Sequence, residues 1–284
     1  MLAMTVVLFG ASWPVMKVAL ASATPLWFAA GRSVLISATV FAVLALRREA
    51  RVPPRGDWPL VASVGTAQIA AFFACSHFGL MHMPAGRGVV IAYSTPIWVL
   101  PLASLFLREP LGVRGILGSA LGLAGLGALL MPELPRLGSP GVLVGEAWLL
   151  GAALGWAIAI VHSRYRRWES PPLQLLAWQM GLAACWLLPA AAILEPDGRI
   201  APTPESLLAL LFLSLFVGPI GAWGAAAVAR ALPANVSSIG FLAAPLIGVA
   251  VSTLWLDERL GWDIVLGGSL ILVGLAVAAR KRAG

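Results

Sequence analysis

The sequence has 284 residues, of which 60% are hydrophobic and only 11% are charged. Soluble domains carry roughly 25% charged residues, so this composition excludes a water-soluble globular protein and indicates a protein that lies in lipid. The formal net charge of +7 does not indicate nucleic-acid binding, because the cations lie in short clusters between apolar stretches.

Apolar stretches follow one another along the whole chain, each close to the roughly 20 residues that a helix needs to cross a bilayer. Their hydrophobicity is continuous and does not alternate, which excludes a β-barrel. We therefore expect an all-α integral membrane protein with ten transmembrane helices. In chain order, the expected spans are 2–21, 25–46, 58–81, 86–107, 112–131, 142–163, 171–194, 206–229, 234–256 and 261–279. The first lacks a basic segment before it, so a retained helix is favoured over a cleaved signal peptide.

The positive charges between the spans indicate the orientation. With ten spans, the loops on the side of the termini hold 13 Lys and Arg residues, and the opposite side holds four, among them Arg87. Cytoplasmic loops carry such an excess, so we expect both termini in the cytoplasm of a cell with an inner membrane. Lys17 and Arg32 fall within spans near their outer ends. Snorkelling to the head groups is favoured for both, and attracting a substrate carboxylate or locking a gate is the alternative.

The two halves of the sequence resemble each other. Pro96 pairs with Pro245 and Glu109 with Glu258 at one constant offset, and Trp13 lies at the position equivalent to Trp156. We therefore expect one five-helix repeat over 1–131 and a second over 142–284. Because five is odd, the second repeat enters the membrane from the opposite side. Inverted repeats of this kind are typical of transporters.

Several of these residues also carry a resemblance to a known family. Trp13, Arg32, Pro96 and the helix exit "LREPLG" are matched in the second half by Trp156, Gln179, Pro245 and "LDERLG". In this pattern the chain resembles the EamA family of the drug/metabolite transporter superfamily, and within it the YddG-type exporters. The resemblance implies export of aromatic and other amino acids.

Carboxylates are absent from the centres of the expected spans. Glu146 comes closest, about one turn inside the outer end of its span. Exporters of cations that exchange them for protons need a buried carboxylate, so we expect a substrate that is neutral or zwitterionic overall.

Candidate substrate-binding residues are those too deep for the membrane interface. Aromatic faces bind flat side chains and ammonium groups, and small hydroxyls bind the polar head of an amino acid. His77 binds substrate or packs as a structural histidine, with equal weight. The candidates are Trp13, His77, Tyr93, Ser94, Trp98, Trp156, Trp223, Ser237 and Ser238, with Pro96 and Pro245 as hinges. Trp178 is also deep by this measure.

No nucleotide-binding, metal-ligand or catalytic nucleophile motif occurs in the sequence, so we expect neither an enzyme nor a cofactor. The leading interpretation is a secondary transporter of amino acids, with the lipid bilayer as its surroundings and a monomer favoured. A broader drug or metabolite exporter is the alternative, ahead of a membrane-embedded enzyme or a lipid flippase.

Overall fold

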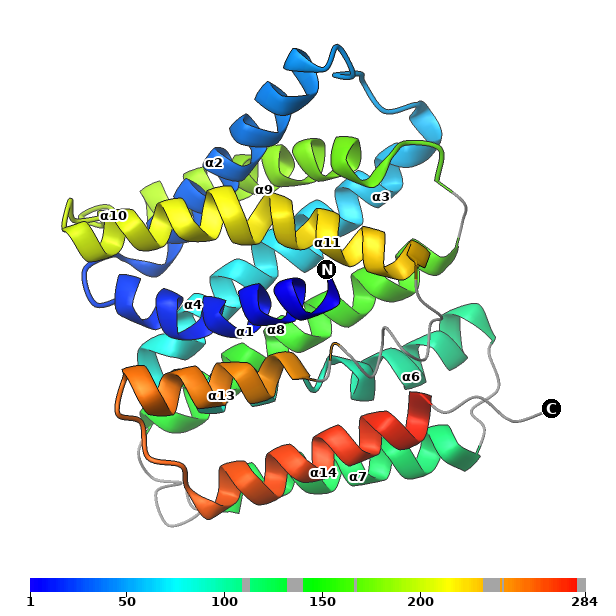
Figure 1. The fold of residues 1–284 in the computed structure, drawn as a ribbon, viewed down its shortest axis with the longest axis vertical. Helices are drawn as coiled ribbons and strands as arrows, with labels where there is room; N and C mark the ends of the chain where they lie inside the picture. The colour runs from blue at the N-terminus through cyan, green and yellow to red at the C-terminus, as the bar shows by residue number, and fades with distance from the viewer. Residues whose placement is uncertain (109–112, 132–139, 166–167, 232–240, 242, 280–284) are drawn as a thin grey trace.

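The structure is a computed structural model that describes residues 1–108, 113–131, 140–165, 168–231, 241 and 243–279. All regular structure within these residues is helical (Figure 1). The helices are α1 (Leu2–Ala19), α2 (Pro25–Leu46), η1 (Arg55–Asp57), α3 (Trp58–Ser63), η2 (Val64–Ala71), α4 (Phe72–His82), α5 (Ala85–Ala92), α6 (Thr95–Leu107), α7 (Val113–Leu130), α8 (Pro140–Tyr165), α9 (Pro172–Leu194), α10 (Pro204–Leu211), η4 (Phe212–Val217), α11 (Gly218–Ala231), α13 (Ala243–Trp255) and α14 (Trp262–Ala279).

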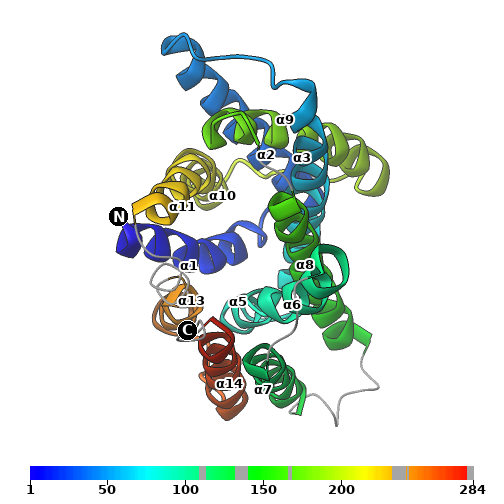
Figure 2. The same ribbon diagram turned by 90° about the vertical axis from the view of Figure 1, so that its right-hand side faces the viewer.

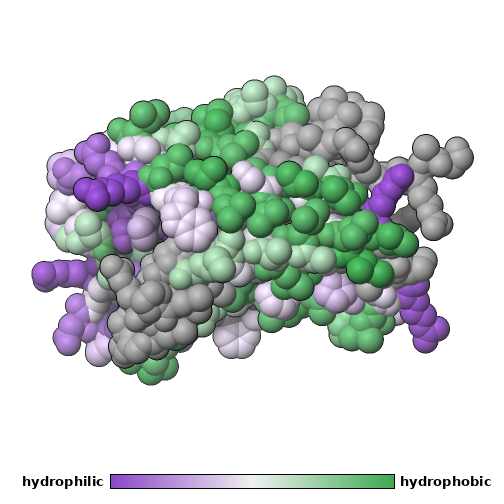
Figure 3. Space-filling view, turned by 90° about the horizontal axis from the view of Figure 1, so that it is seen from below, coloured by the Kyte–Doolittle hydropathy of each residue, from purple (hydrophilic) through white to green (hydrophobic). Residues whose placement is uncertain are grey.

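Seven helical segments of the described residues are long and apolar enough to cross a membrane, and three shorter apolar helices lie within α7, α13 and α14. This confirms an all-α membrane protein, while the count of ten spans stays a prediction. The molecular surface supports the same conclusion, because a hydrophobic band separates hydrophilic groups at the two ends of the bundle (Figure 3). Side chains in that band face lipid, the only solvent that suits them.

Two long spans contain a π-helical turn. Residues Arg55–His82 run through η1, α3, η2 and α4, and η2 is the π-helical part. The segment from α10 to α11 contains a second such turn, η4. π-Helical turns are rare and loosen the regular i→i+4 hydrogen bonding, and they occur often at functional sites.

The expected span 86–107 is not one helix but two, α5 and α6. The backbone leaves the helix at Tyr93 and Ser94, directly before Pro96. Proline has no N–H, so it cannot donate to the carbonyl of Ala92 four residues earlier. The hydroxyl of Thr95 donates to that carbonyl instead, at 2.9 Å.

The helices pack as antiparallel and crossing neighbours around a shared core. The strongest pairings join α7 to α14, α2 to α9, α4 to α8 and α1 to α13. Viewed nearly along the helices, α1 lies between the α10–α11 segment and α13, while α7 and α14 pack side by side at one edge (Figure 2). One buried cluster, which includes Trp13 and Leu149, joins α1 to α5 and α8.

Glycines let α7 and α14 approach closely. A Cβ added at Gly125 would lie 2.6 Å from the carbonyl oxygen of Gly267, and one at Gly274 would lie 2.5 Å from that of Gly118. Side chains larger than hydrogen do not fit at these crossings. The glycines of α7 and α14 therefore serve packing within the chain.

We expect the substitution Gly125→Leu to separate α7 from α14 and to lower the melting temperature of the purified protein in detergent, because overpacking costs about 1–3 kcal/mol. Gly127→Leu on the same helix is the matched control, since a Cβ there meets nothing within 4 Å. Equal melting temperatures for the two variants would contradict this close crossing.

Candidate functional site

Three aromatic side chains meet in the interior of the bundle. Trp13 on α1 contacts Phe72 at the start of α4, with ring centroids 6.3 Å apart and planes at 88°. Trp156 on α8 contacts the same ring, with centroids 4.6 Å apart and planes at 67°. Edge-to-face arrangements of this kind are favourable for aromatic rings. The structure thus brings the two predicted tryptophans to one phenylalanine, and we call Trp13, Phe72 and Trp156 the aromatic row.

A buried arginine lies next to this row. Arg32 on α2 is only 5% exposed, and its guanidinium carbon lies 4.2 Å from the ring centroid of Phe73. Its Nη1 lies 3.1 Å from both Met16 Sδ and His77 Nε2. The prediction that Arg32 snorkels to the head groups is therefore wrong, because its guanidinium points between helices. We call Met16, Arg32, Phe73 and His77 the Arg32 cluster.

His77 is fully buried in this cluster, where its ring stacks against Phe73. Its Nδ1 lies 3.0 Å from the carbonyl oxygen of Pro25. A carbonyl only accepts, so Nδ1 carries the proton, and Nε2 is left to accept from Arg32. These hydrogen bonds indicate that His77 is a neutral imidazole, which orients the guanidinium of Arg32.

Further residues of the predicted set lie at the break between α5 and α6. Tyr93 packs against the cluster that contains Trp13, and Ser94, the residue directly before α6, is fully buried. The Ser94 hydroxyl and the Trp98 indole N–H are buried without a hydrogen-bond partner among the described residues. Both are polar groups of the kind that a polar ligand satisfies.

A cavity of about 450 Å³ opens between α5, α13 and α14. Tyr93 and the predicted hinge Pro245 both line it, together with apolar residues such as Val90, Leu246 and Val249. The polar side chains in its lining are Tyr93, Thr253 and Ser269. The cavity is suited to apolar groups.

The other predicted residues lie elsewhere. Trp223 on α11 is 51% exposed. Trp178 contacts Trp58 edge-to-face, and its indole donates to the carbonyl of Arg51 at 3.1 Å, within the first two turns of α9. Ser237 and Ser238 lie outside the described residues, as does the side chain of Pro96.

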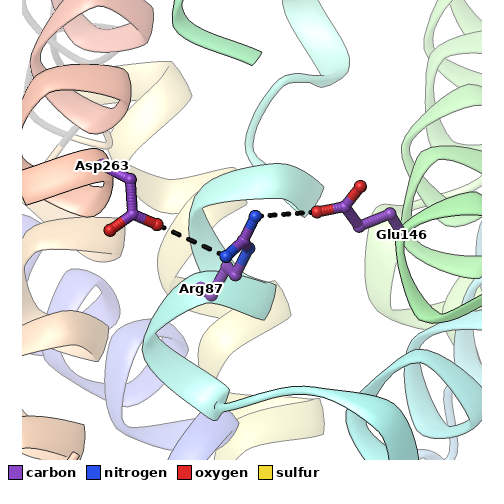
Figure 4. A network of polar contacts seen from close by, with 3 residues as sticks. All are labelled: Arg87, Glu146 and Asp263. Atoms are coloured by element: carbon purple, nitrogen blue, oxygen red, sulfur yellow. Dashed lines mark hydrogen bonds and ion pairs between the residues drawn. The ribbon is translucent and has the colours of Figure 1, made fainter. Parts of the chain in front are cut away.

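A buried ion-pair network joins three helices at one end of the bundle. Arg87 at the start of α5 lies 2.9 Å from Glu146 on α8 and 3.3 Å from Asp263 on α14 (Figure 4). All three residues are less than 10% exposed. The sequence interpretation counted Arg87 among the charges on the side opposite the termini and did not predict that it is buried between two carboxylates. The available signal was an arginine in the first turn of a span, at the same depth as Glu146.

Further polar contacts gather at this end, which we call the Arg87 end. Glu258, after α13, accepts from the first backbone N–H groups of α5, with Ala85 at 2.7 Å and Gly86 at 2.9 Å. Carboxylates stabilise helix N-termini in this way. Lys17 donates to the carbonyls of Leu80 and Met83 at the end of α4. Lys17 therefore does not snorkel as predicted; it satisfies the last carbonyls of a neighbouring helix.

The same kind of contact anchors α2. Glu195, which follows α9, accepts from Leu26 N at 3.1 Å and from Trp27 N at 3.3 Å. At the opposite end of the bundle, Asp57 accepts from Ser170 N at 2.8 Å, just before α9. The starts of α2 and α9 are thus each bonded by an acidic residue from the other's half of the chain.

The described residues include no candidate metal site, because no three of their His, Cys, Asp or Glu side chains lie close together. The described arrangement offers aromatic faces, the buried guanidinium of Arg32 and a few unbonded donors. Groups of these kinds are suited to contacts with an organic molecule, and among the described residues they include no nucleophile with its base.

We expect Arg87→Met to remove the guanidinium that pairs with the buried Glu146 and Asp263, and breaking a buried pair costs about 3–5 kcal/mol. The free energy of unfolding, measured by denaturant titration in mixed micelles, should fall accordingly. The double variant Arg87→Met/Glu146→Gln should recover part of the loss. Arg199→Met, at an exposed position of the same end, should change stability by no more than about 0.5 kcal/mol.

Comparisons with known proteins give one consistent answer. The chain is 28% identical over 283 residues to the uncharacterized transporter YvbV of Bacillus subtilis (strain 168), covering 99% of this chain and 91% of that protein. It is 27% identical to a probable amino-acid metabolite efflux pump of Escherichia coli (strain K12), covering 96% and 92%. It is 24% identical to a probable terminal-alkyne amino-acid exporter of Streptantibioticus cattleyicolor, covering 100% and 93%.

A solved crystal structure shares the fold, with a TM-score of 0.68 at 18% identity over 98% of this chain and 95% of the other. The model of the EamA-like transporter family matches residues 1–131 and 143–280. Relatives and family are transporters and not enzymes. The chain belongs to the EamA-like transporter family.

Proposed function

We propose that this protein is a secondary transporter that moves amino acids, aromatic and other neutral or zwitterionic ones, across the inner membrane. It works as an exporter or facilitator by alternating access between two inverted five-helix repeats, 1–131 and 142–284, with cytoplasmic termini and as a monomer. The observation that carries the proposal is the aromatic row. Trp13 and Trp156 come from corresponding helices of the two repeats and meet on one ring, Phe72, inside the bundle.

The described packing supports two inverted repeats. The contact of α1 with α13 has its counterpart in the contact of α8 with α6, and the π-helical turns η2 and η4 occupy corresponding spans. The α7–α14 crossing is reciprocal, since Gly125 meets Gly267 while Gly274 meets Gly118. The family model also matches the chain in two segments, 1–131 and 143–280. Mirrored halves of this kind exchange two shapes around one central site.

The arrangement of polar contacts supports alternating access. Ion pairs and capping bonds hold the Arg87 end together, and the α5–α6 break and the π-helical turns allow the middle of the spans to bend. Pro96 and Pro245 are the proposed hinges. Opening this end requires the Arg87 contacts to separate.

Amino acids are supported as substrates by the relatives, two of which are described as a probable amino-acid metabolite efflux pump and a probable amino-acid exporter. Aromatic faces suit their side chains, and unbonded donors at Ser94 and Trp98 suit their polar head. Ser237, Ser238 and Trp223 stay in the proposed set from the sequence.

A broader metabolite or drug exporter is the second candidate. The cavity between α5, α13 and α14 favours it, because a lining with few polar groups selects for apolar bulk and not for an amino-acid head group.

The test is uptake of labelled amino acids by proteoliposomes. We expect wild-type uptake to be saturable. Trp13→Ala and Trp156→Ala should each reduce it about 10-fold or more, because each removes one of the two indole rings that contact Phe72. Trp255→Ala, at a 54% exposed position, is the matched control and should retain uptake. If correctly folded protein moves no amino acid but moves apolar metabolites, the second candidate replaces the first.

A further inference from the structure

Arg32 differs from the other buried arginine in the bundle in the charge of its partners. Arg87 meets two carboxylates, whereas Arg32 meets a thioether, a neutral imidazole and an aromatic ring. No carboxylate of the described residues pairs with Arg32. A buried charge without a counter-ion is costly in a membrane, and charges in that position usually serve function.

The unbonded edge of the Arg32 guanidinium indicates which kind of ligand it would bind. Among the described residues, hydrogen bonds engage only Nη1, and Nε is buried with no partner. Nε–H and Nη2–H lie along one edge of the planar group, and this edge binds a carboxylate through two parallel hydrogen bonds. Arg32 is therefore held by its Nη1 and presents the fork that carboxylates fit.

Neighbouring side chains fix the orientation of the Arg32 guanidinium. His77 is fixed by the Pro25 carbonyl and accepts from Nη1, while Phe73 supports the guanidinium face at 4.2 Å. A guanidinium with a fixed plane loses little entropy on binding, so its selectivity for a planar anion is high.

The position next to the aromatic row identifies the rest of the ligand. Phe73 lies 6.4 Å from Phe72, the ring that joins Trp13 to Trp156. Met16 lies three residues after Trp13, on the same face of α1. An organic acid with its carboxylate on Arg32 therefore has its side chain next to the aromatic row.

We propose that Arg32 is the carboxylate-binding residue of the transport site, oriented by His77, and that it selects substrates with a free carboxylate. This inference rests on the proposed function, because it assigns the head-group contact of the same site. It also favours amino acids over uncharged metabolites as cargo.

The test compares leucine with two analogues that each lack one of its charged groups: leucinamide lacks the carboxylate, and 4-methylpentanoate lacks the α-ammonium group. Purified wild-type protein in detergent is titrated with leucine, leucinamide and 4-methylpentanoate, and binding is followed by tryptophan fluorescence and thermal shift. We expect leucinamide to bind about 10- to 100-fold more weakly than leucine, since a hydrogen-bonded charge contributes that much. In Arg32→Gln, leucine and leucinamide should bind within about 3-fold of each other, and 4-methylpentanoate binding should be lost.

Arg47→Gln is the matched control. It removes the same charge from the exposed end of the same helix and should keep the wild-type ratio. If Arg32→Gln does not fold, Arg32→Lys replaces it, because lysine keeps the charge without the fork and should reduce the ratio. An unchanged ratio in a folded Arg32 variant would show that the residue is only structural.

Binding in detergent separates this inference from the proposed function. A protein that binds leucine through Arg32 but moves no amino acid in liposomes contradicts the transport proposal alone. A protein that transports leucine with the same preference over leucinamide after Arg32→Gln contradicts the carboxylate site alone.

Discussion

The structure depends on one constraint: lipid offers no hydrogen-bond partner, so each polar group inside the membrane must be satisfied by the protein itself. Charged side chains therefore lie where groups from other segments of the chain can form hydrogen bonds or ion pairs with them. Glu195 and Glu258 accept from the starts of α2 and α5, and Lys17 donates to the end of α4. These bonds use helix ends, which are the only places where backbone groups of an α-helix are free.

The same constraint explains where the helices are irregular. Pro96 removes a donor from the middle of a span, and Thr95 replaces the missing bond from its side chain. The π-helical turn η2 ends directly before Phe72, the central ring of the aromatic row. Regular backbone and ion pairs thus stiffen the Arg87 end, and the irregular turns lie near the proposed site. Under the proposed mechanism, such a bundle bends in its middle and separates at its ends.

Sequence reasoning predicted what depends on hydrophobicity along the chain. It predicted an all-α membrane protein and singled out Trp13 and Trp156 as equivalent positions, because hydropathy and internal similarity can be read directly along the chain. It could not predict the burial of Arg87 or Arg32. Hydropathy indicates how deep a residue lies but not which helix faces it, and the partners of Arg87 lie 59 and 176 residues away. Ser237 and Ser238 lie outside the described residues.

The two buried arginines show why partners, more than depth, indicate a role. Arg87 is neutralised by Glu146 and Asp263, so its charge is used to join α5, α8 and α14. Arg32 has nearly the same exposure but is held only by uncharged groups, with Nε unbonded. A fully compensated charge stabilises one arrangement of helices, whereas an uncompensated charge is stabilised only when an anion binds to it. In a transporter, the first is suited to a gate and the second to a binding site.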